Sequence, residues 1–361
     1  MDSRKGGPHL ALDRDGGWYP SPVFSRARLL QLTSALNEKM VLVYGDIVAD
    51  RFIYGNPKRI SREAPVLILR QYQDDVLLGG GGNAINNLRS LGGLPVPVSV
   101  LGDDNEGALL LERLMAQGID SGGILRLNRY RTPQKVRVLG GMPHSARQQI
   151  VRYDIEDHVD LTEDEVERFA TLLREQMRVC DGALISDYGY GVVSPYLVSN
   201  LTGLADGKPV TLDSRYALMK FTDVTAATPN EEEASAAAGI PLYGENEEEN
   251  LRFVGESLRQ GLDAEALLIT RGSRGMALFE RDSREPLLIP VHGSDQIADV
   301  TGAGDTVIAA FTLALSAGAS FAEAAKLANY AGGIVVMKSG TATVSNDELR
   351  IAIEDDDDLN D

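Results

Sequence analysis

Short apolar runs alternate with amphipathic stretches along most of this chain. Residues 41–45 are almost continuously apolar, which is typical of a strand that is buried on both faces of a sheet. Residues 25–39 place Leu29, Leu32 and Leu36 on one face at helical spacing. Because such strand and helix units repeat, the pattern predicts an α/β fold: a three-layer, doubly wound, mostly parallel sheet with helices on both faces.

The same pattern predicts the positions of the later elements. We expect strands over residues 96–101, 183–185, 209–212, 224–227, 266–270 and 276–279. We expect helices over residues 83–91, 106–117, 162–177, 195–204, 231–238, 250–260, 303–317 and 322–337. Thr162 and Glu165 have the spacing of a capping box, which marks the start of the helix over 162–177.

Two segments, 51–78 and 133–153, break this alternation because they are strand-like and carry no long helix. We expect them to form a small separate β-sheet that acts as a lid and excludes water from a transfer reaction. The alternative is that they are edge strands of the main sheet. Both segments belong to a single domain over residues 25–350, which lies between an irregular N-terminal extension (1–24) and an acidic, solvated tail (351–361).

Composition narrows the classes of function. The chain has a formal net charge of −18, so it lacks the positive charge that is typical of a nucleic-acid-binding protein. No apolar run reaches membrane-spanning length and the start of the chain has no signal-peptide core, so we expect no membrane partner and a cytoplasmic location. We expect Cys180 to be a buried small hydrophobe. Zinc is not expected, because the histidines are scattered without ligand spacing: His9, His144, His158 and His292.

The most informative motif is residues 299–306, with the sequence DVTGAGDT, directly before an apolar helical run. Gly302, Ala303 and Gly304 leave backbone N–H groups unshielded where the helix begins, and such a helix start is a ready anion site. Asp305 adds a carboxylate beside that site, which suggests a base for phosphoryl transfer onto a hydroxyl. The alternative is a tight strand-to-helix connection with an ordinary acidic first turn.

Two further motifs follow predicted strands at the edge where open α/β sheets bind ligands. Asp46 and Asp50 could accept hydrogen bonds from sugar hydroxyls, although Asp46 could equally cap a turn. Four glycines at 79–82 precede Asn83, and so long a run implies that something approaches the backbone closely. The run matches neither a dinucleotide-binding fingerprint nor a G-x-x-x-x-G-K-[ST] phosphate loop.

Two motifs suit a nucleotide and its metal. Asn230 and Glu233 lie one helical turn apart and suit a hydrated Mg²⁺, although an acidic first helical turn would look the same. Residues 268–276 form a strand–turn–strand pattern in which Thr270, Gly272 and Gly275, together with the arginines of the turn, could line a nucleotide phosphate. Ordinary hairpin turns share that pattern.

In this order, the motifs resemble those of the ribokinase-like carbohydrate kinases of the phosphofructokinase-B type, over residues 41–344. Within that family the chain is most similar to the kinase module of the D-glycero-β-D-manno-heptose-7-phosphate kinases. Four segments carry that closer resemblance: GDIVADRF (45–52), RISREAPV (59–66), SDY (186–188) and TGAGDTV (301–307). The resemblance implies an ATP-dependent kinase that phosphorylates the anomeric hydroxyl of the heptose phosphate, in lipopolysaccharide precursor synthesis. We expect no nucleotidyltransferase module, since the chain stops after one kinase length.

Site roles follow from this resemblance and from the motifs. Asp305 would act as the base, with the amides of Gly302, Ala303 and Gly304 stabilising the developing charge. The sugar would be held by Asp46, Asp50, Gly79, Gly80, Asn83 and Asp187, and a distal phosphate by Arg62, Arg137, Arg152 and Arg215. The nucleotide would be bordered by Asn230, Thr270, Gly272, Gly275, Gly302, Gly304 and Asn329, with Mg²⁺ on Asn230 and Glu233.

The resemblance also implies a monovalent cation such as K⁺ near Ile297, Ala298 and the 338–345 loop, and we expect a homodimer through the lid sheet. Two positions depart from the family pattern. Tyr190 stands where a lysine is expected, and Ser214 and Arg215 replace the last two residues of an Asp-Pro-Lys motif, which leaves the distal phosphate in doubt. Two alternatives therefore remain: a kinase for another sugar, sugar phosphate or nucleoside, and a non-catalytic sugar- or nucleotide-binding regulator.

Overall fold

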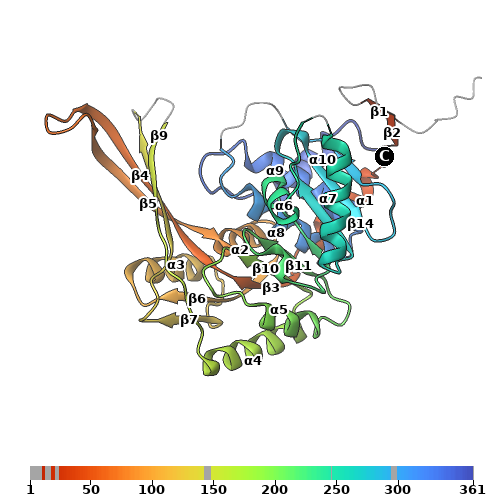
Figure 1. Ribbon diagram of the computed structural model, residues 1–361, viewed down its shortest axis with the longest axis horizontal. Coiled ribbons are helices and arrows are strands. Elements are labelled where there is room, and N and C mark those ends of the chain that lie inside the picture. The colour runs from red at the N-terminus through yellow and green to blue at the C-terminus, as the bar shows by residue number, and fades with distance from the viewer. Residues whose placement is uncertain are drawn as a thin grey trace, which may run out of the picture.

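The fold is described here from a computed structural model (Figure 1). The structure describes residues 10–12, 18–20, 24–141, 148–244, 246–293 and 299–360. Over these residues, no helix has both the length and the apolar character needed to cross a bilayer. Within the N-terminal extension, β1 (Leu10–Leu12) pairs antiparallel with β2 (Trp18–Pro20).

The main sheet has nine strands in the order β15-β14-β13-β12-β11-β10-β3-β6-β7. All neighbouring pairs from β13 to β7 are parallel, and β14 and β15 are added to that edge by antiparallel pairing. The bounds are β3 (Met40–Gly45), β6 (Leu94–Gly102), β7 (Ile124–Leu127), β10 (Gly182–Asp187), β11 (Val210–Ser214), β12 (Ala226–Ala227), β13 (Ala266–Thr270), β14 (Met276–Glu280) and β15 (Leu287–Ile289).

The side chains of β3 show why this sheet has helices on both faces. Val41 and Val43 belong to one buried cluster, and Leu42 and Tyr44 belong to another on the opposite face. The first cluster includes residues of α1 (Arg26–Ala35), α2 (Gly81–Ser90), α3 (Asn105–Ala116), α8 (Ala303–Ser316), α9 (Phe321–Val335) and α10 (Asn346–Glu354). The second includes residues of α4 (Glu163–Val179), α5 (Pro195–Thr202), α6 (Glu231–Ala238) and α7 (Glu247–Gly261). The three-layer, doubly wound prediction is confirmed.

A second sheet of four strands stands apart from the first, in the order β5-β4-β8-β9. Its strands are β4 (Ile47–Ile60), β5 (Leu67–Gly80), β8 (Gln134–Gly140) and β9 (Gln148–Ile155). The long β4–β5 hairpin projects away from the body of the molecule (Figure 1). The prediction of a separate sheet is therefore confirmed. It begins earlier than expected, because Ile47 already pairs with Gly80, so that Asp50 lies within a strand.

The acidic C-terminal segment differs from the solvated tail that its charge suggested. Leu359 is buried, and the backbone of Asn360 exchanges hydrogen bonds with Phe24 and Arg26. Asp356 accepts hydrogen bonds from Lys326 Nζ at 3.0 Å and from the hydroxyl of Tyr330. The buried side chain of Leu359 and the paired carboxylate of Asp356 therefore hold the segment against α9 and the start of α1.

Candidate active site

Asp305 lies in the first turn of α8, where the chain folds back on the glycine run of α2. The carboxylate is buried, and it accepts hydrogen bonds from Asn83 Nδ2 at 3.0 Å and from the Tyr188 hydroxyl at 2.8 Å. Burial raises the pKa of Asp305 to about 6, while the two hydrogen bonds oppose that rise. The group is therefore a carboxylate at neutral pH whose proton affinity is high enough for a general base.

Glycine is required at Gly302, where the two signature segments touch, and at Gly80, where the glycine run passes the backbone of Asp46. Gly302 has φ 77°, and a Cβ atom on it would lie 2.4 Å from Asn83 Nδ2. Gly80 has φ 58°, and its Cβ would lie 2.9 Å from the carbonyl oxygen of Asp46. In contrast, a Cβ on Gly304 would meet nothing within 4 Å. The start of α8 therefore faces open space, as an anion site at a helix N-terminus requires.

Asp46 is buried and contacts the backbone of the loop that carries Tyr188. Its carboxylate accepts backbone N–H groups from Tyr188 at 2.8 Å and from Tyr190 and Val192 at 3.3 Å. Burial and the nearby Asp187 raise the pKa of Asp46 to about 7. These contacts favour the turn-capping alternative for Asp46 over sugar binding, and they position Tyr188 beside Asp305.

Asp187 is buried next to Asp46. It accepts hydrogen bonds from the backbone N–H of Gly189 at 3.0 Å and from Ser214 Oγ at 2.6 Å. Ser214, one of the departures from the family motif, therefore supports the loop that starts at Asp187.

Asp50 connects the second sheet to the site. It forms a buried ion pair with Arg137 at 2.7 Å. Gly79 makes room for it, since a Cβ there would lie 2.6 Å from Asp50 Oδ2. The side chains of Asp50 and Arg137 thus neutralise one another at the base of the second sheet.

Of the four arginines predicted to bind a distal phosphate, Arg137 and Arg152 are cross-strand neighbours in the second sheet, and the other two lie on other segments. Arg137 is paired with Asp50, and Arg152 is paired with Asp154 at 2.6 Å. Arg62 is exposed in the 61–66 turn that joins β4 to β5, at the far end of that hairpin. Arg215 is exposed too, but its guanidinium carbon lies 5.9 Å from the centre of the Tyr188 ring.

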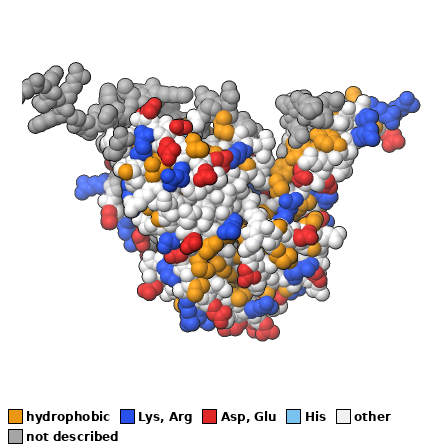
Figure 2. Space-filling view, turned by 180° about the vertical axis from the view of Figure 1, so that it is seen from behind, with side chains coloured by type: hydrophobic (Ala, Val, Ile, Leu, Met, Phe, Trp, Pro, Cys, Tyr) orange, Lys and Arg blue, Asp and Glu red, His pale blue; other side chains and the backbone are white. Residues whose placement is uncertain are grey.

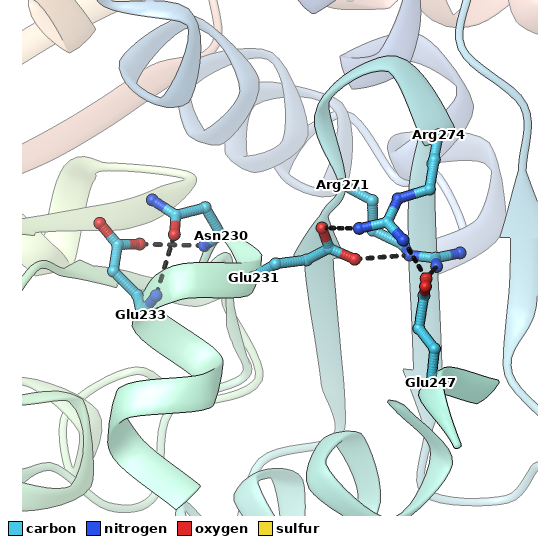
Figure 3. Close-up of polar contacts among 6 residues, drawn as sticks. All are labelled: Asn230, Glu231, Glu233, Glu247, Arg271 and Arg274. Atoms are coloured by element: carbon cyan, nitrogen blue, oxygen red, sulfur yellow. Dashed lines mark hydrogen bonds and ion pairs between the residues drawn. The ribbon is translucent and has the colours of Figure 1, made fainter. Parts of the chain in front are cut away.

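Asn230 and Glu233 form a reciprocal capping box at the start of α6 (Figure 3). The N–H of Asn230 donates to Glu233 Oε2 and the N–H of Glu233 donates to Asn230 Oδ1, both at 2.9 Å. Burial raises the pKa of Glu233, and burial together with the Glu233 charge raises that of Asp213. Carboxylate and amide oxygens are hard donors of the kind that a divalent cation prefers. In the part of the chain that the structure describes, no group of three or more acidic, histidine or cysteine side chains forms a complete cage for a metal.

The arginines of the β13–β14 turn form ion pairs with glutamates, so their charge is already compensated without a phosphate. Arg271 pairs with Glu231 at 2.9 Å and with Glu247 at 2.8 Å, and Arg274 contacts the same two carboxylates (Figure 3). Glu231 is the first residue of α6, immediately after Asn230. The four-residue network therefore ties the turn to the helix end that carries the predicted metal site.

The other predicted nucleotide residues fall into two groups. Thr270 forms an isolated parallel β-bridge with Asn230. Gly272 has φ 57°, and a Cβ on it would meet nothing within 4 Å. Gly275 is needed for the turn itself, since a Cβ there would lie 2.0 Å from the carbonyl oxygen of Ile289. The side chain of Asn329 donates to the carbonyl oxygen of Pro290 at 2.8 Å.

Part of the predicted monovalent-cation site lies outside the described residues, namely Ile297 and Ala298, as does His144. Within the 338–345 loop, Lys338 Nζ donates to the Thr343 carbonyl oxygen at 2.7 Å.

Comparison with known proteins decides the family. Residues 38–348 match the model of the pfkB family carbohydrate kinases. The chain belongs to this family. It is accordingly an ATP-dependent carbohydrate kinase, and the family implies that a divalent metal accompanies the nucleotide.

Curated relatives of this kinase include two proteins named bifunctional protein HldE. The one from Geobacter metallireducens is 40% identical over 311 residues, which cover 85% of this chain and 61% of the relative. The one from Desulfatibacillum aliphaticivorans is 38% identical over 318 residues, which cover 87% of this chain and 63% of the relative. The kinase thus spans less than two thirds of the length of these relatives.

Solved structures confirm the ribokinase-like fold of this kinase. Arabidopsis thaliana ribokinase complexed with ribose and ATP superposes with a TM-score of 0.67 at 20% identity, covering 88% of this chain and 99% of the other. Escherichia coli phosphofructokinase-2 in complex with potassium gives a TM-score of 0.67 at 20% identity, covering 88% and 98%.

Sequence reasoning did not assign two residues that the structure brings to this kinase's site, Tyr188 and Lys135. In the sequence, Tyr188 belongs to the SDY segment and Lys135 to the strand-like segment 133–153. The sequence holds no usable signal for the burial of Lys135, because polar and apolar side chains alternate over residues 135–138 as in a strand with one solvated face.

Proposed function

We propose that this kinase transfers the γ-phosphoryl group of ATP to the anomeric hydroxyl of D-glycero-β-D-manno-heptose 7-phosphate. The observation that carries the chemistry is Asp305, buried between Asn83 and Tyr188 at the open N-terminus of α8. The sugar assignment is supported by the sequence resemblance to heptose-7-phosphate kinases and by 36–40% identity to proteins named HldE.

In this mechanism Asp305 takes the proton of the hydroxyl as its oxygen attacks the γ-phosphorus. The new P–O bond forms as the bond to the ADP oxygen breaks, and ADP leaves with the electron pair. The backbone N–H groups of Gly302, Ala303 and Gly304 stabilise the charge that develops on the transferred group. Asp50, Gly79, Gly80, Asn83 and Asp187 line the sugar side, and Asp46 acts through the loop that it caps.

Mg²⁺ would be held on the nucleotide side by Asn230 and Glu233, and the charge of Glu233 also acts on the buried Asp213. When bound with ATP, it would neutralise phosphate charge. Thr270 and Gly272 would border the nucleotide beside it, while Gly275 and Asn329 shape that border through backbone contacts.

The test is a substrate panel with ATP and Mg²⁺: the heptose 7-phosphate, free heptose, fructose 6-phosphate, ribose and adenosine. We expect the highest kcat/KM with heptose 7-phosphate. A higher kcat/KM for another acceptor would overturn the sugar assignment and leave the family activity intact. If no acceptor consumes ATP while sugars or nucleotides still bind, the non-catalytic regulator is favoured instead.

We also propose that the kinase forms a homodimer through its second sheet. Large apolar side chains are exposed on this sheet, as the orange groups on the projecting arm in Figure 2 show, and they include Ile60, Val66, Leu67, Tyr72, Ile150, Val151 and Tyr153. Light scattering should give a dimer mass for the native chain and a monomer mass for Val151→Glu. A native monomer at micromolar concentration would contradict the proposal.

A further inference from the structure

Asn87 is a fully buried amide on α2, one helical turn after Asn83. Its Nδ2 group donates to the carbonyl oxygen of Asn83 at 3.0 Å and to Asn83 Oδ1 at 3.3 Å. Its Oδ1 accepts the backbone N–H of Val344 at 3.3 Å. Both ends of the Asn87 amide are therefore used, as a polar group without access to water requires.

Asn83 connects Asn87 to the catalytic carboxylate. Its Nδ2 group donates to Asp305 Oδ2 at 3.0 Å and to the carbonyl oxygen of Gly302 at 3.2 Å. Both asparagines are 0% exposed and Asp305 is 4% exposed, so water competes little for these hydrogen bonds. A continuous row of hydrogen bonds therefore leads from the backbone of Val344 through two amides to Asp305.

The direction of this row is fixed at its Val344 end. A backbone N–H can only donate, so the atom of Asn87 that faces it is the oxygen, and Nδ2 of Asn87 then faces Asn83. Since an NH2 group can only donate, it holds Asn83 Oδ1 on its own side and leaves Asn83 Nδ2 for Asp305. The carbonyl oxygen of Gly302, which can only accept, favours the same orientation from the other side. The opposite orientation of Asn83 would place an amide oxygen against the carboxylate.

We propose that Asn87 is a positioning residue for phosphoryl transfer, because it holds the amide of Asn83 in the orientation that donates a hydrogen bond to the base. The proposal rests on the kinase function proposed above, in which Asp305 is that base. The hydrogen bond from Asn83 favours the charged form of Asp305, so it opposes the rise in pKa that burial causes. With the amide turned, the carboxylate would lose this donor and face an oxygen, so it would take up a proton at a higher pH.

Groups on other elements also act on Asp305. Four of them are titratable: the Tyr188 hydroxyl after β10, Lys135 on β8, Asp50 on β4 and Asp213 on β11. Lys135 lowers the pKa of Asp305 and Asp50 raises it. All four side chains are present in native protein and in every variant of Asn87, so a difference between these proteins reports the change on α2.

The test is the pH profile of kcat/KM at saturating ATP, with the acceptor that gives the highest native activity. In Asn87→Asp a carboxylate oxygen would face Asn83 Oδ1, so the Asn83 amide turns and donates to the new carboxylate. We expect the acid limb of the profile to move up by about one pH unit. Asn87→Leu adds no charge and keeps the size of the side chain. Since Gly302 still favours the native orientation of Asn83, we expect about half that shift in Asn87→Leu.

Asn86→Asp is the matched control. Asn86 precedes Asn87 on the same helix, is half-buried and takes no part in the row of hydrogen bonds. The substitution adds the same charge to α2, and we expect it to move the acid limb by no more than about 0.3 pH units. Equal shifts in Asn86→Asp and Asn87→Asp, with a native acid limb in Asn87→Leu, would show an effect of charge alone and overturn the proposal.

A purely structural role for Asn87 predicts a different result. Both Asn87 variants would then melt at a lower temperature but keep the native acid limb, which would also overturn the proposal. If Asn87→Asp does not fold, Asn87→Leu decides the question by itself. Failure of the kinase function is distinguishable, because Asp305→Asn would then keep native turnover. An inactive Asp305→Asn together with native acid limbs in the Asn87 variants would leave that function intact and exclude only the role of Asn87.

Discussion

The hydroxyl of Tyr188 donates a hydrogen bond to Oδ1 of Asp305 at 2.8 Å, and Asn83 holds the other oxygen of the same carboxylate. A general base acts in its deprotonated form, so kcat/KM should fall about tenfold per pH unit below the pKa of Asp305, which lies at about 6. Tyr188→Phe removes a hydrogen bond that favours the charged form, which raises this pKa. We therefore expect the acid limb of the profile to move up by about one pH unit.

Tyr190→Phe is the control for that experiment, because Tyr190 lies on the same loop and its hydroxyl faces Glu156 at 3.4 Å instead of Asp305. Its pH profile should match that of native protein. An unshifted acid limb in Tyr188→Phe would mean that the hydrogen bond does not tune the base.

Asp305→Asn tests the base directly. The substitution keeps the shape of the side chain but removes its ability to accept a proton, so kcat should fall roughly 10²–10⁴-fold. ATP affinity, measured by calorimetry, should change little, because the carboxylate is not a predicted nucleotide ligand. Near-native turnover in a correctly folded variant would remove Asp305 from its proposed role.

Arg271 provides a test of how the metal side is positioned. Its side chain is 10% exposed and pairs with both Glu231 and Glu247, next to the capping box of Asn230 and Glu233. Arg271→Met should loosen the first turn of α6, and we expect a severalfold higher KM for Mg·ATP with a smaller change in kcat. The readout is initial rate against Mg²⁺ concentration at fixed ATP.

Arg281→Met serves as its control. Arg281 follows β14 and forms an exposed ion pair with Asp263, with side chains 49% and 67% exposed, which contributes little. If Arg271→Met and Arg281→Met give the same Mg²⁺ dependence as native protein, the network has no positioning role.

The C-terminal segment should contribute to stability through Asp356. Its pair with Lys326 is largely buried, with side chains 13% and 11% exposed. Asp356→Ala removes the acceptor for both Lys326 and Tyr330, and we expect a loss of about 1–3 kcal/mol in the free energy of unfolding, seen as a melting temperature lower by several degrees. Asp357→Ala, an exposed neighbour, should have no measurable effect. Equal melting temperatures for the two variants would contradict this role.

Local patterns were sufficient to predict most elements of the main sheet. Residues 41–45 are apolar at every position but the last, and this continuity identified β3 as a strand with two buried faces. The capping box at Thr162 and Glu165 marked the start of α4 correctly. Short elements without strong periodicity were missed, among them β7 and β15, because three or four residues carry too little pattern.

The chemistry of single residues was harder to predict than the elements on which they lie. Asp46 and Asp50 look equivalent in sequence, yet one accepts three backbone N–H groups and the other pairs with Arg137. Which partner a carboxylate meets depends on segments far away along the chain, and the local pattern contains no information about them.

The sequence by itself determined the layered α/β fold, because burial follows the periodicity of apolar positions. It also determined the glycine-rich helix start with its aspartate, because glycines at such a start leave the amides open. Only the tertiary structure decided how charges are shared: Asn83 meets Asp305 across 222 residues, the predicted phosphate ligand Arg137 is neutralised by Asp50, and Lys135 lies over the ring of Tyr188. A polar or charged side chain that is removed from water needs a partner, and both the removal and the partner arise only when distant segments pack together.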